Sequence, residues 1–196
     1  PNPLAKVPKF ISINLMNKVF VKVFNEWWFR KTPMHTVKRF IPIEKFFYPL
    51  DAIDNWNNIY GANGFIQYQI IVPDTCSYMI RKVLEKLKYI NALSFLPVLK
   101  RLGKANKSYL SFPSQGWTLS IDLPAKNQKI EKTLEELDQE IIKIGGKIYL
   151  AKDVRQSAST FKKTYKSLRS WQQKKEILDP NCIFKSDIAN RLKICN

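Results

Sequence analysis

The segment 116–123 (GWTLSIDL) alternates apolar and polar residues without interruption, which is the pattern of a β-strand with one buried face. Its apolar side chains share one side, and Thr118, Ser120 and Asp122 share the other. Such a strand requires neighbouring strands and an apolar layer against its buried face. The chain must therefore fold around a sheet that carries a row of polar side chains on its opposite face.

The rest of the chain contains periodic segments that would complete this sheet and cover it. Residues 65–72 (FIQYQIIV) predict a second strand, with Gln67 and Gln69 on one face. In chain order we expect a helix over 10–30, a strand over 65–72, a helix from about 74 to 91, an edge strand over 93–101, a strand over 116–123, a helix over 127–144, a strand over 147–151, a helix over 157–176 and a short helix capped by Ser186 or Asp187. This order predicts an α+β fold, a mostly antiparallel sheet with helices packed on one face.

The length of 196 residues favours one domain. We expect a single domain over 1–196, with a helical lead-in segment at 1–46 and the core of the domain at 47–196. The chain opens with Pro-Asn-Pro rather than methionine, so we expect a fragment of a longer protein.

Large apolar residues recur at helical spacing within 10–30, which favours a mostly buried helix. An interfacial helix lying in a membrane surface is the alternative, since Lys18 and Lys22 would line its polar edge. No apolar run reaches the roughly 18 residues that cross a bilayer.

A net charge of +17 favours an anionic partner such as a phospholipid surface, a phosphorylated substrate or nucleic acid. The excess of 26 lysines over 7 arginines also fits the codon bias of an AT-rich genome. Nucleic-acid binders favour arginine, so we expect no nucleic acid partner. The three cysteines, Cys76, Cys182 and Cys195, lack CxxC spacing and predict neither a disulfide framework nor a zinc site. The chain has a single histidine as well, so we expect no metal. The cysteine pattern favours a reduced, cytoplasmic compartment.

Two polar rows and two lysines are the candidate chemistry. Gln67 and Gln69 would lie on one strand, Thr118 and Ser120 on another, while Lys100 and Lys152 are expected at or near strand ends. A solvated sheet face is one interpretation, and the floor of a pocket for a polyhydroxylated ligand is the other. The chain has no GxGxxG, GxxxxGK[ST], GxSxG or HExxH motif, so any nucleotide cofactor must be held mainly by another segment.

Four segments match a family pattern in order and at family-like spacing. They are FYPLDAIDNWNNIYGANGFIQYQIIVP at 47–73, LSFPSQGWTLSIDLP at 110–124, GGKIYLAKDVR at 145–155 and DPNCIFKSDIANRL at 179–192. The chain resembles the C-terminal half of the decaprenylphosphoryl-β-D-ribose oxidase family, in the vanillyl-alcohol-oxidase superfamily that also includes D-arabinono-1,4-lactone oxidase. The resemblance implies a substrate domain lying over the flavin of an FAD-binding domain that this chain lacks.

The resemblance also implies roles for individual residues. The lysine of the family's YxAKD motif, here Lys152, is the catalytic residue beside flavin and substrate, and Tyr149 of the same motif lies near the cofactor. The substrate-binding positions carried over from the family are Gln67, Gln69, Lys100, Thr118, Ser120 and Phe47. Thr118, Ser120 and Phe47 stand where asparagine, cysteine and tyrosine occur in relatives, which leaves the substrate open.

The chemistry implied is oxidation of a secondary alcohol of a sugar by hydride transfer to flavin N5. An isolated lysine is a poor base at neutral pH, so Lys152 is expected to orient the hydroxyl and to stabilise negative charge on the reduced ring. The expected substrate is a lipid-linked phosphosugar, with a partner reductase completing an epimerisation and a possible peripheral membrane contact. A soluble aldonolactone or sugar-alcohol oxidase is the alternative, and a non-catalytic basic module for membrane or nucleic acid is a third.

Overall fold

The computed structural model describes residues 5–8, 18–60, 63–92, 94 and 97–194. Contacts divide the chain into two units, one formed mainly by Pro1–Phe65 and the other by Ile66–Ala92, Leu96–Leu123 and Asn127–Asn196. The smaller unit contains short elements: β1 (Ala5–Lys6), α1 (Lys18–Lys31), α2 (Ile43–Phe47), β2 (Ile53–Asp54) and 3-10 turns at Pro49–Ala52 and Trp56–Tyr60. The prediction of one domain with a boundary at 46/47 stays a prediction.

In the smaller unit β1 pairs with β2 in parallel, and a cluster of aromatic rings lies near the end of its Pro1–Phe65 segment. Tyr60 stacks on Phe65 with ring centroids 4.3 Å apart, and Trp56 lies 5.6 Å from Phe65.

Helix α1 corrects one expectation. Within its described span only Val21 is a buried hydrophobic residue, whereas Trp27, Trp28 and Phe29 are 52%, 57% and 76% exposed. The prediction of a mostly buried helix was wrong there, because an apolar stripe is buried only where another surface covers it. The first part of that predicted helix, 10–17, lies outside the described residues.

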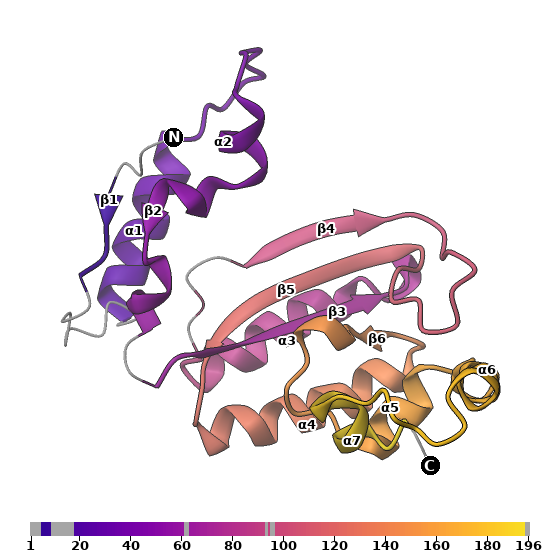
Figure 1. The fold of residues 1–196 in the computed structure, drawn as a ribbon. Coiled ribbons are helices and arrows are strands. Elements are labelled where there is room, and N and C mark those ends of the chain that lie inside the picture. The colour runs from indigo at the N-terminus through magenta and orange to yellow at the C-terminus, as the bar shows by residue number, and fades with distance from the viewer. Residues whose placement is uncertain (1–4, 9–17, 61–62, 93, 95–96, 195–196) are drawn as a thin grey trace. The chain divides into compact units, whose positions relative to one another are not determined.

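The larger unit is built on a four-stranded sheet in the order β4-β5-β3-β6 (Figure 1). Its strands are β3 (Phe65–Val72), β4 (Val98–Leu102), β5 (Gly116–Pro124) and β6 (Lys147–Ile148). The pairs β3–β6 and β4–β5 are antiparallel, and β4 lies at an edge of the sheet, one of the two positions, edge or bulge, that Pro97 permits in a strand. A strand was expected over 93–101, and the structure has it at Val98–Leu102. Residues 93, 95 and 96 of the expected strand lie outside the described residues.

Two amphipathic helices cover one face of this sheet. They are α3 (Tyr78–Tyr89), preceded by a 3-10 turn at Asp74–Cys76, and α4 (Gln128–Lys143), capped by the Asn127 side chain. Their apolar stripes pack against the inward side chains of β3 and β5 in one continuous core that includes Tyr68, Ile70, Val72, Met79, Val83, Leu87, Leu119, Ile121, Leu123, Ile130, Leu134, Leu137 and Ile141. The predicted α+β fold with helices on one sheet face is confirmed.

The C-terminal part differs from the prediction in its helix boundaries. The expected helix at 157–176 is two helices, α5 (Ala158–Thr164) and α6 (Leu168–Leu178). The chain leaves the helix at Tyr165 (φ −106°, ψ 84°), whose buried hydroxyl donates to the carbonyl of Ile148 at 2.8 Å. Helix α7 (Asp187–Leu192) begins after Ser186, whose side chain accepts from Ala189 N as predicted.

Candidate functional site on the polar face of the sheet

The sheet face opposite the helices carries the predicted polar row, and its members bond to one another across the strands. Gln67 Nε2 donates to Asp122 Oδ1 at 2.9 Å, and Gln69 Nε2 donates to Thr118 Oγ1 at 3.0 Å. Thr118 and Asp122 are buried, while the two glutamines are half-buried. The alternating pattern of both strands thus produces a single polar surface, with amide hydrogens and carbonyl oxygens still available for a ligand.

Lys152 joins this row from the other end of the chain. Its Nζ donates to Ser120 Oγ at 3.0 Å, and the side chain is half-buried. Among the described residues Lys152 makes no ion pair, so its positive charge is not cancelled by a bonded carboxylate. The row therefore combines neutral amides and hydroxyls with one fixed cation.

Lys152 does not lie at a strand end, which corrects the expectation of a strand over 147–151. Strand β6 ends at Ile148, Tyr149 N donates to Gln69 O at 2.9 Å, and Leu150–Lys152 form a 3-10 turn. Asp153 follows this turn, and its Oδ1 accepts from Arg155 N and Gln156 N at 3.2 and 2.9 Å.

The turn that carries Lys152 is anchored by helix α7. Arg191 Nη2 lies 3.0 Å from Asp153 Oδ2 and 3.1 Å from Asp153 O, and Arg191 Nη1 donates to Gln156 O. The Asp153 side chain is 3% exposed in this pair. The motifs at 145–155 and 179–192 are therefore linked by a part-buried ion pair one residue from the candidate catalytic lysine.

A second buried network lies beneath the glutamines. Tyr68, between Gln67 and Gln69, points to the opposite face and donates its hydroxyl to Asp138 Oδ1 at 2.8 Å. Arg155 Nη2 also contacts Asp138, at 2.8–2.9 Å, and its guanidinium lies 5.2 Å from the Tyr68 ring centroid. Burial raises the pKa of Asp138 to about 6, against the opposing effect of Arg155 and the Tyr68 bond, and burial also raises the pKa of Tyr68.

Of the other predicted positions, Lys100 and Tyr149 lie on the polar face of the sheet, and Phe47 lies in the smaller unit. Lys100 pairs in register with Thr118, so both lie on the polar face, and Lys100 is exposed at the edge strand. Tyr149 follows β6 on the same face as Gln69, with its ring centroid 4.6 Å from that of Phe112. Phe47 ends α2 in the smaller unit and is 66% exposed, so its role at the site stays a prediction.

Residues that sequence reasoning did not assign to the site are the buried supports: Tyr68, Asp138, Asp153, Arg155 and Arg191. Tyr68, Asp153, Arg155 and Arg191 lie inside the quoted motifs, which was their signal, whereas Asp138 lies in α4, outside all four segments. The distances that join them come from separate elements and could not be read from spacing.

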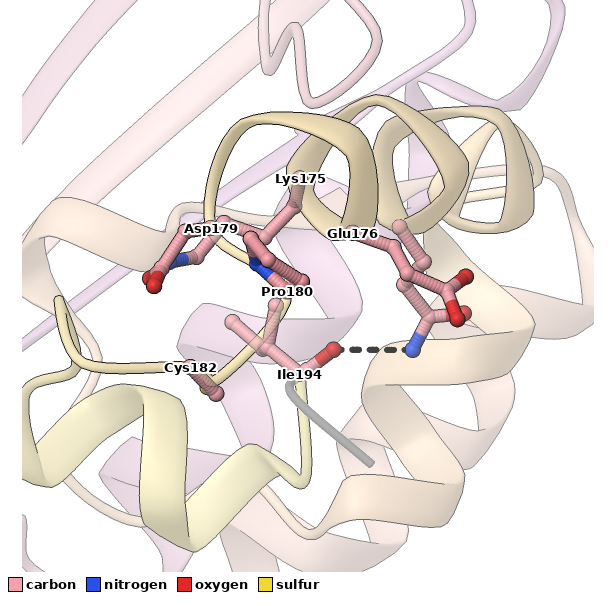
Figure 2. A pocket seen from close by; sticks show the side chains of 7 residues that line it. Lys175, Glu176, Asp179, Pro180, Cys182 and Ile194 are labelled. Carbon is pink, nitrogen blue, oxygen red and sulfur yellow. Dashed lines mark hydrogen bonds and ion pairs between the residues drawn. The ribbon is translucent and has the colours of Figure 1, made fainter.

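The Asp-Pro segment after α6 forms a separate small cavity of about 120 Å³ (Figure 2). Asp179 accepts from Ile183 N and Phe184 N at 2.8 and 3.0 Å and is paired with Lys175, which lowers its pKa. Figure 2 shows Lys175, Glu176 and Asp179 around this cavity, which has room for a few water molecules and not for a sugar or a flavin. The closing motif thus has a structural role, in which Asp179 fixes the turn.

The cysteines differ in their bonding state. Cys182 is disulfide-bonded, so the expectation of no disulfide was wrong, whereas Cys76 is a free thiol. In the described part of the chain, no group of three or more His, Cys, Asp or Glu side chains could hold a metal ion. None of the helices in that part is long and apolar enough to cross a membrane.

The fold and the site define an α+β domain whose sheet presents a polar, lysine-bearing face and whose other face is closed by helices. Residues 73–192 match the sequence model of the D-arabinono-1,4-lactone oxidase family, and the chain belongs to that family. It is 34% identical over 191 residues to the decaprenylphosphoryl-beta-D-ribose oxidase of Mycolicibacterium smegmatis, which covers 97% of this chain and 41% of that protein. An uncharacterized protein of Streptomyces coelicolor is 30% identical over 143 residues, covering 73% of this chain and 39% of its own length.

The predicted resemblance is confirmed by these matches. The chain spans about two fifths of the length of the curated relatives it matches.

Proposed function

We propose that this chain is the substrate-binding part of an FAD-dependent oxidase that oxidises a secondary alcohol of a sugar. The observation that supports it most strongly is the 3.0 Å bond from Lys152 Nζ to Ser120 Oγ, which fixes a cation on the polar face. The family match points to oxidase chemistry, and the row supplies groups that bind hydroxyls.

The residues of the polar face fit the neighbourhood of a flavin. A bound flavin would supply the hydride acceptor for the carbon that carries the alcohol, and reduction would leave negative charge on its ring. Lys152 would stabilise that charge, because its ammonium is held in place by Ser120 and makes no ion pair among the described residues. The chain has no glycine-rich dinucleotide motif, so the FAD would be held mainly by the portion of its relatives that this chain does not cover.

The row would orient the sugar rather than remove its proton. Each of Gln67 and Gln69 uses one amide hydrogen in its bond to Asp122 or Thr118, which leaves, among the described residues, the other hydrogen and the carbonyl oxygen for sugar hydroxyls. Lys152, as an ammonium, would donate to the oxygen of the alcohol being oxidised, with the alcohol proton leaving to solvent. Lys100, on the same face at the edge strand, would meet the outer part of the substrate.

A lipid-linked phosphosugar is the substrate that we propose, and a soluble aldonolactone or sugar alcohol is the second candidate. One relative is named for a decaprenylphosphoryl ribose, which supports the lipid-linked substrate and, with it, a partner reductase that would complete an epimerisation. The exposed rings of Trp27, Trp28 and Phe29, beside Arg30 and Lys31, suit the interface of an anionic membrane. The family name supports the soluble alternative.

The test is a Lys152→Met variant of the full-length protein, with Lys129→Met on α4 as the matched control. Loss of one fixed charge-stabilising donor should reduce kcat by roughly 10²–10³, with flavin content from the visible spectrum unchanged. Unaltered turnover in Lys152→Met would contradict the proposal.

A second experiment separates the two candidate substrates. Co-sedimentation with anionic vesicles at moderate salt should retain the full-length protein, and a Trp27→Ser, Trp28→Ser variant should lose binding. No binding of the unmodified protein would favour the soluble substrate.

A further inference from the structure

A hollow of about 480 Å³ lies in the larger unit, where the β4–β5 connection meets the ends of α4 and α5 and the start of α6, and no residue of the Lys152 row lines it. Four lysines line it and no carboxylate does; we call it the lysine hollow. Its basic lining consists of Lys143, Lys147, Lys163 and Lys166. A chain with a general excess of lysine would spread these charges over its surface, often beside acidic side chains, as Lys82 and Lys86 do with Glu140. Four ammonium groups around one hollow without an acid are a focused positive field.

Helix ends alter this field only slightly. Lys143 and Lys163 lie in the last turns of α4 and α5, where a lysine also offsets the negative end of the helix dipole. Each helix terminus amounts to roughly half an elementary charge. The two C-terminal ends are partly offset by the N-terminus of α6, whose Ser167 lines the hollow and makes no side-chain cap. The field of the four lysines therefore remains strongly positive.

Lys147 distinguishes this hollow from an ordinary cluster of surface lysines. Its side chain is part-buried, and its Nζ donates to the backbone carbonyl of Ser111 at 2.9 Å. Among the described residues no carboxylate lies within ion-pairing distance, and burial lowers the pKa of Lys147. A cation that is partly withdrawn from water and has no counter-charge is unfavourable, so an anion in the hollow would stabilise it.

The wall also contains an unsatisfied hydroxyl. Ser111 lines the hollow, and its Oγ is buried without a hydrogen-bond partner in the described part of the chain. A serine hydroxyl turns about one bond between staggered positions, so it can donate to an acceptor that enters. Buried polar atoms are rarely left unpaired, which again indicates a missing acceptor.

We propose that the lysine hollow binds the phosphate group of a phosphorylated ligand, with Lys147 and Lys166 as principal cations and Ser111 as a neutral donor. Phosphate matches the lining because it carries up to two negative charges and only acceptor oxygens, while the lining offers donors and no acid. The volume exceeds that of a lone phosphate and leaves room for a diphosphate or an attached group. This site does not depend on the oxidase function of the Lys152 row.

The test is calorimetric titration of the full-length protein with inorganic phosphate and with pyrophosphate. Lys147→Gln and Lys166→Gln are each expected to weaken binding about tenfold or more, since a hydrogen bond to a charged group contributes about 1.5–3 kcal/mol. Lys132→Gln, which removes an exposed α4 lysine outside the hollow, is the matched control and should bind as the unmodified protein does. Lys166 is exposed, so its replacement keeps the test valid if Lys147→Gln folds poorly.

Two results would overturn the proposal: no measurable binding of either probe to the unmodified protein, or an equal small loss in all three variants, which would indicate net charge alone. A vesicle arm identifies the source of the phosphate. If binding to phosphatidylglycerol vesicles falls in Lys166→Gln but not in Lys132→Gln, the ligand is a lipid headgroup; if it is unchanged while pyrophosphate binding falls, the ligand is a free phosphate compound.

Discussion

Removal of the Tyr68 hydroxyl tests the buried support beneath the two glutamines. In Tyr68→Phe the ring stays under Arg155, but Asp138 loses the donor at 2.8 Å. A lost bond to a neutral acceptor costs about 1 kcal/mol, and a lost bond to a charged one about 1.5–3 kcal/mol. The cost should therefore depend on whether Asp138 is ionised.

The sign follows from the pKa of Asp138. Burial raises this pKa from an ordinary 3.8 to about 6, so the folded state binds the proton more tightly than the unfolded state. The stabilisation from that proton is complete below about pH 4 and is lost as the pH rises through 6. Since the Tyr68 bond lowers this pKa, Tyr68→Phe should raise it further, and a rise of one unit corresponds to about 1.4 kcal/mol.

Urea unfolding at pH 5 and pH 7.5 measures the effect. We expect Tyr68→Phe to lower the free energy of unfolding by about 1 kcal/mol at pH 5 and by roughly 2–3 kcal/mol at pH 7.5. Tyr165→Phe removes a bond to a neutral carbonyl, so its loss of about 1 kcal/mol should be the same at both pH values. Tyr78→Phe, at an exposed position, should leave the free energy of unfolding unchanged at both pH values. An equal loss for Tyr68→Phe at both pH values would refute the assignment of an ionising Asp138 in this network.

Three further predictions concern Arg191, Asp179 and Gly116. Arg191→Gln should release the turn that holds Lys152, with kcat reduced while KM changes little, because Lys152 itself remains; steady-state kinetics of the full-length protein decide this. Asp179→Asn should lower the midpoint of thermal unfolding, since a carboxylate that accepts two backbone N–H groups is replaced by a neutral amide. Gly116→Ala should lower stability by several kcal/mol in the same assay, because a Cβ there would lie 2.1 Å from a backbone carbonyl at φ +151°, whereas Gly103→Ala, with open space, should be neutral.

The polar row was predictable because strand periodicity acts locally. The alternation at 116–123 placed Thr118 and Ser120 on one face, and the structure joins them to Gln69 and Lys152. The position of Lys152 was predicted less well. The turn that carries Lys152 is held in place by the pair between Asp153 and Arg191, which lies nearly forty residues later in the chain.

Helix α1 shows that periodicity can predict a helix without predicting its burial. Its periodicity predicted a helix correctly over Lys18–Lys31, but burial depends on what covers the stripe, and Trp28 and Phe29 remain exposed. The break at Tyr165 is similar, since a tertiary bond to Ile148 competes with one more turn of helix.

The sequence by itself determined the fold class, the two-faced sheet and the identity of the polar side chains, because each follows from the spacing of neighbouring residues. Only the tertiary structure decided that Lys152 bonds to Ser120, that Asp153 pairs with Arg191 and that four lysines surround one hollow. These contacts join residues far apart in the chain, and their energies depend on distances and burial that no local pattern contains.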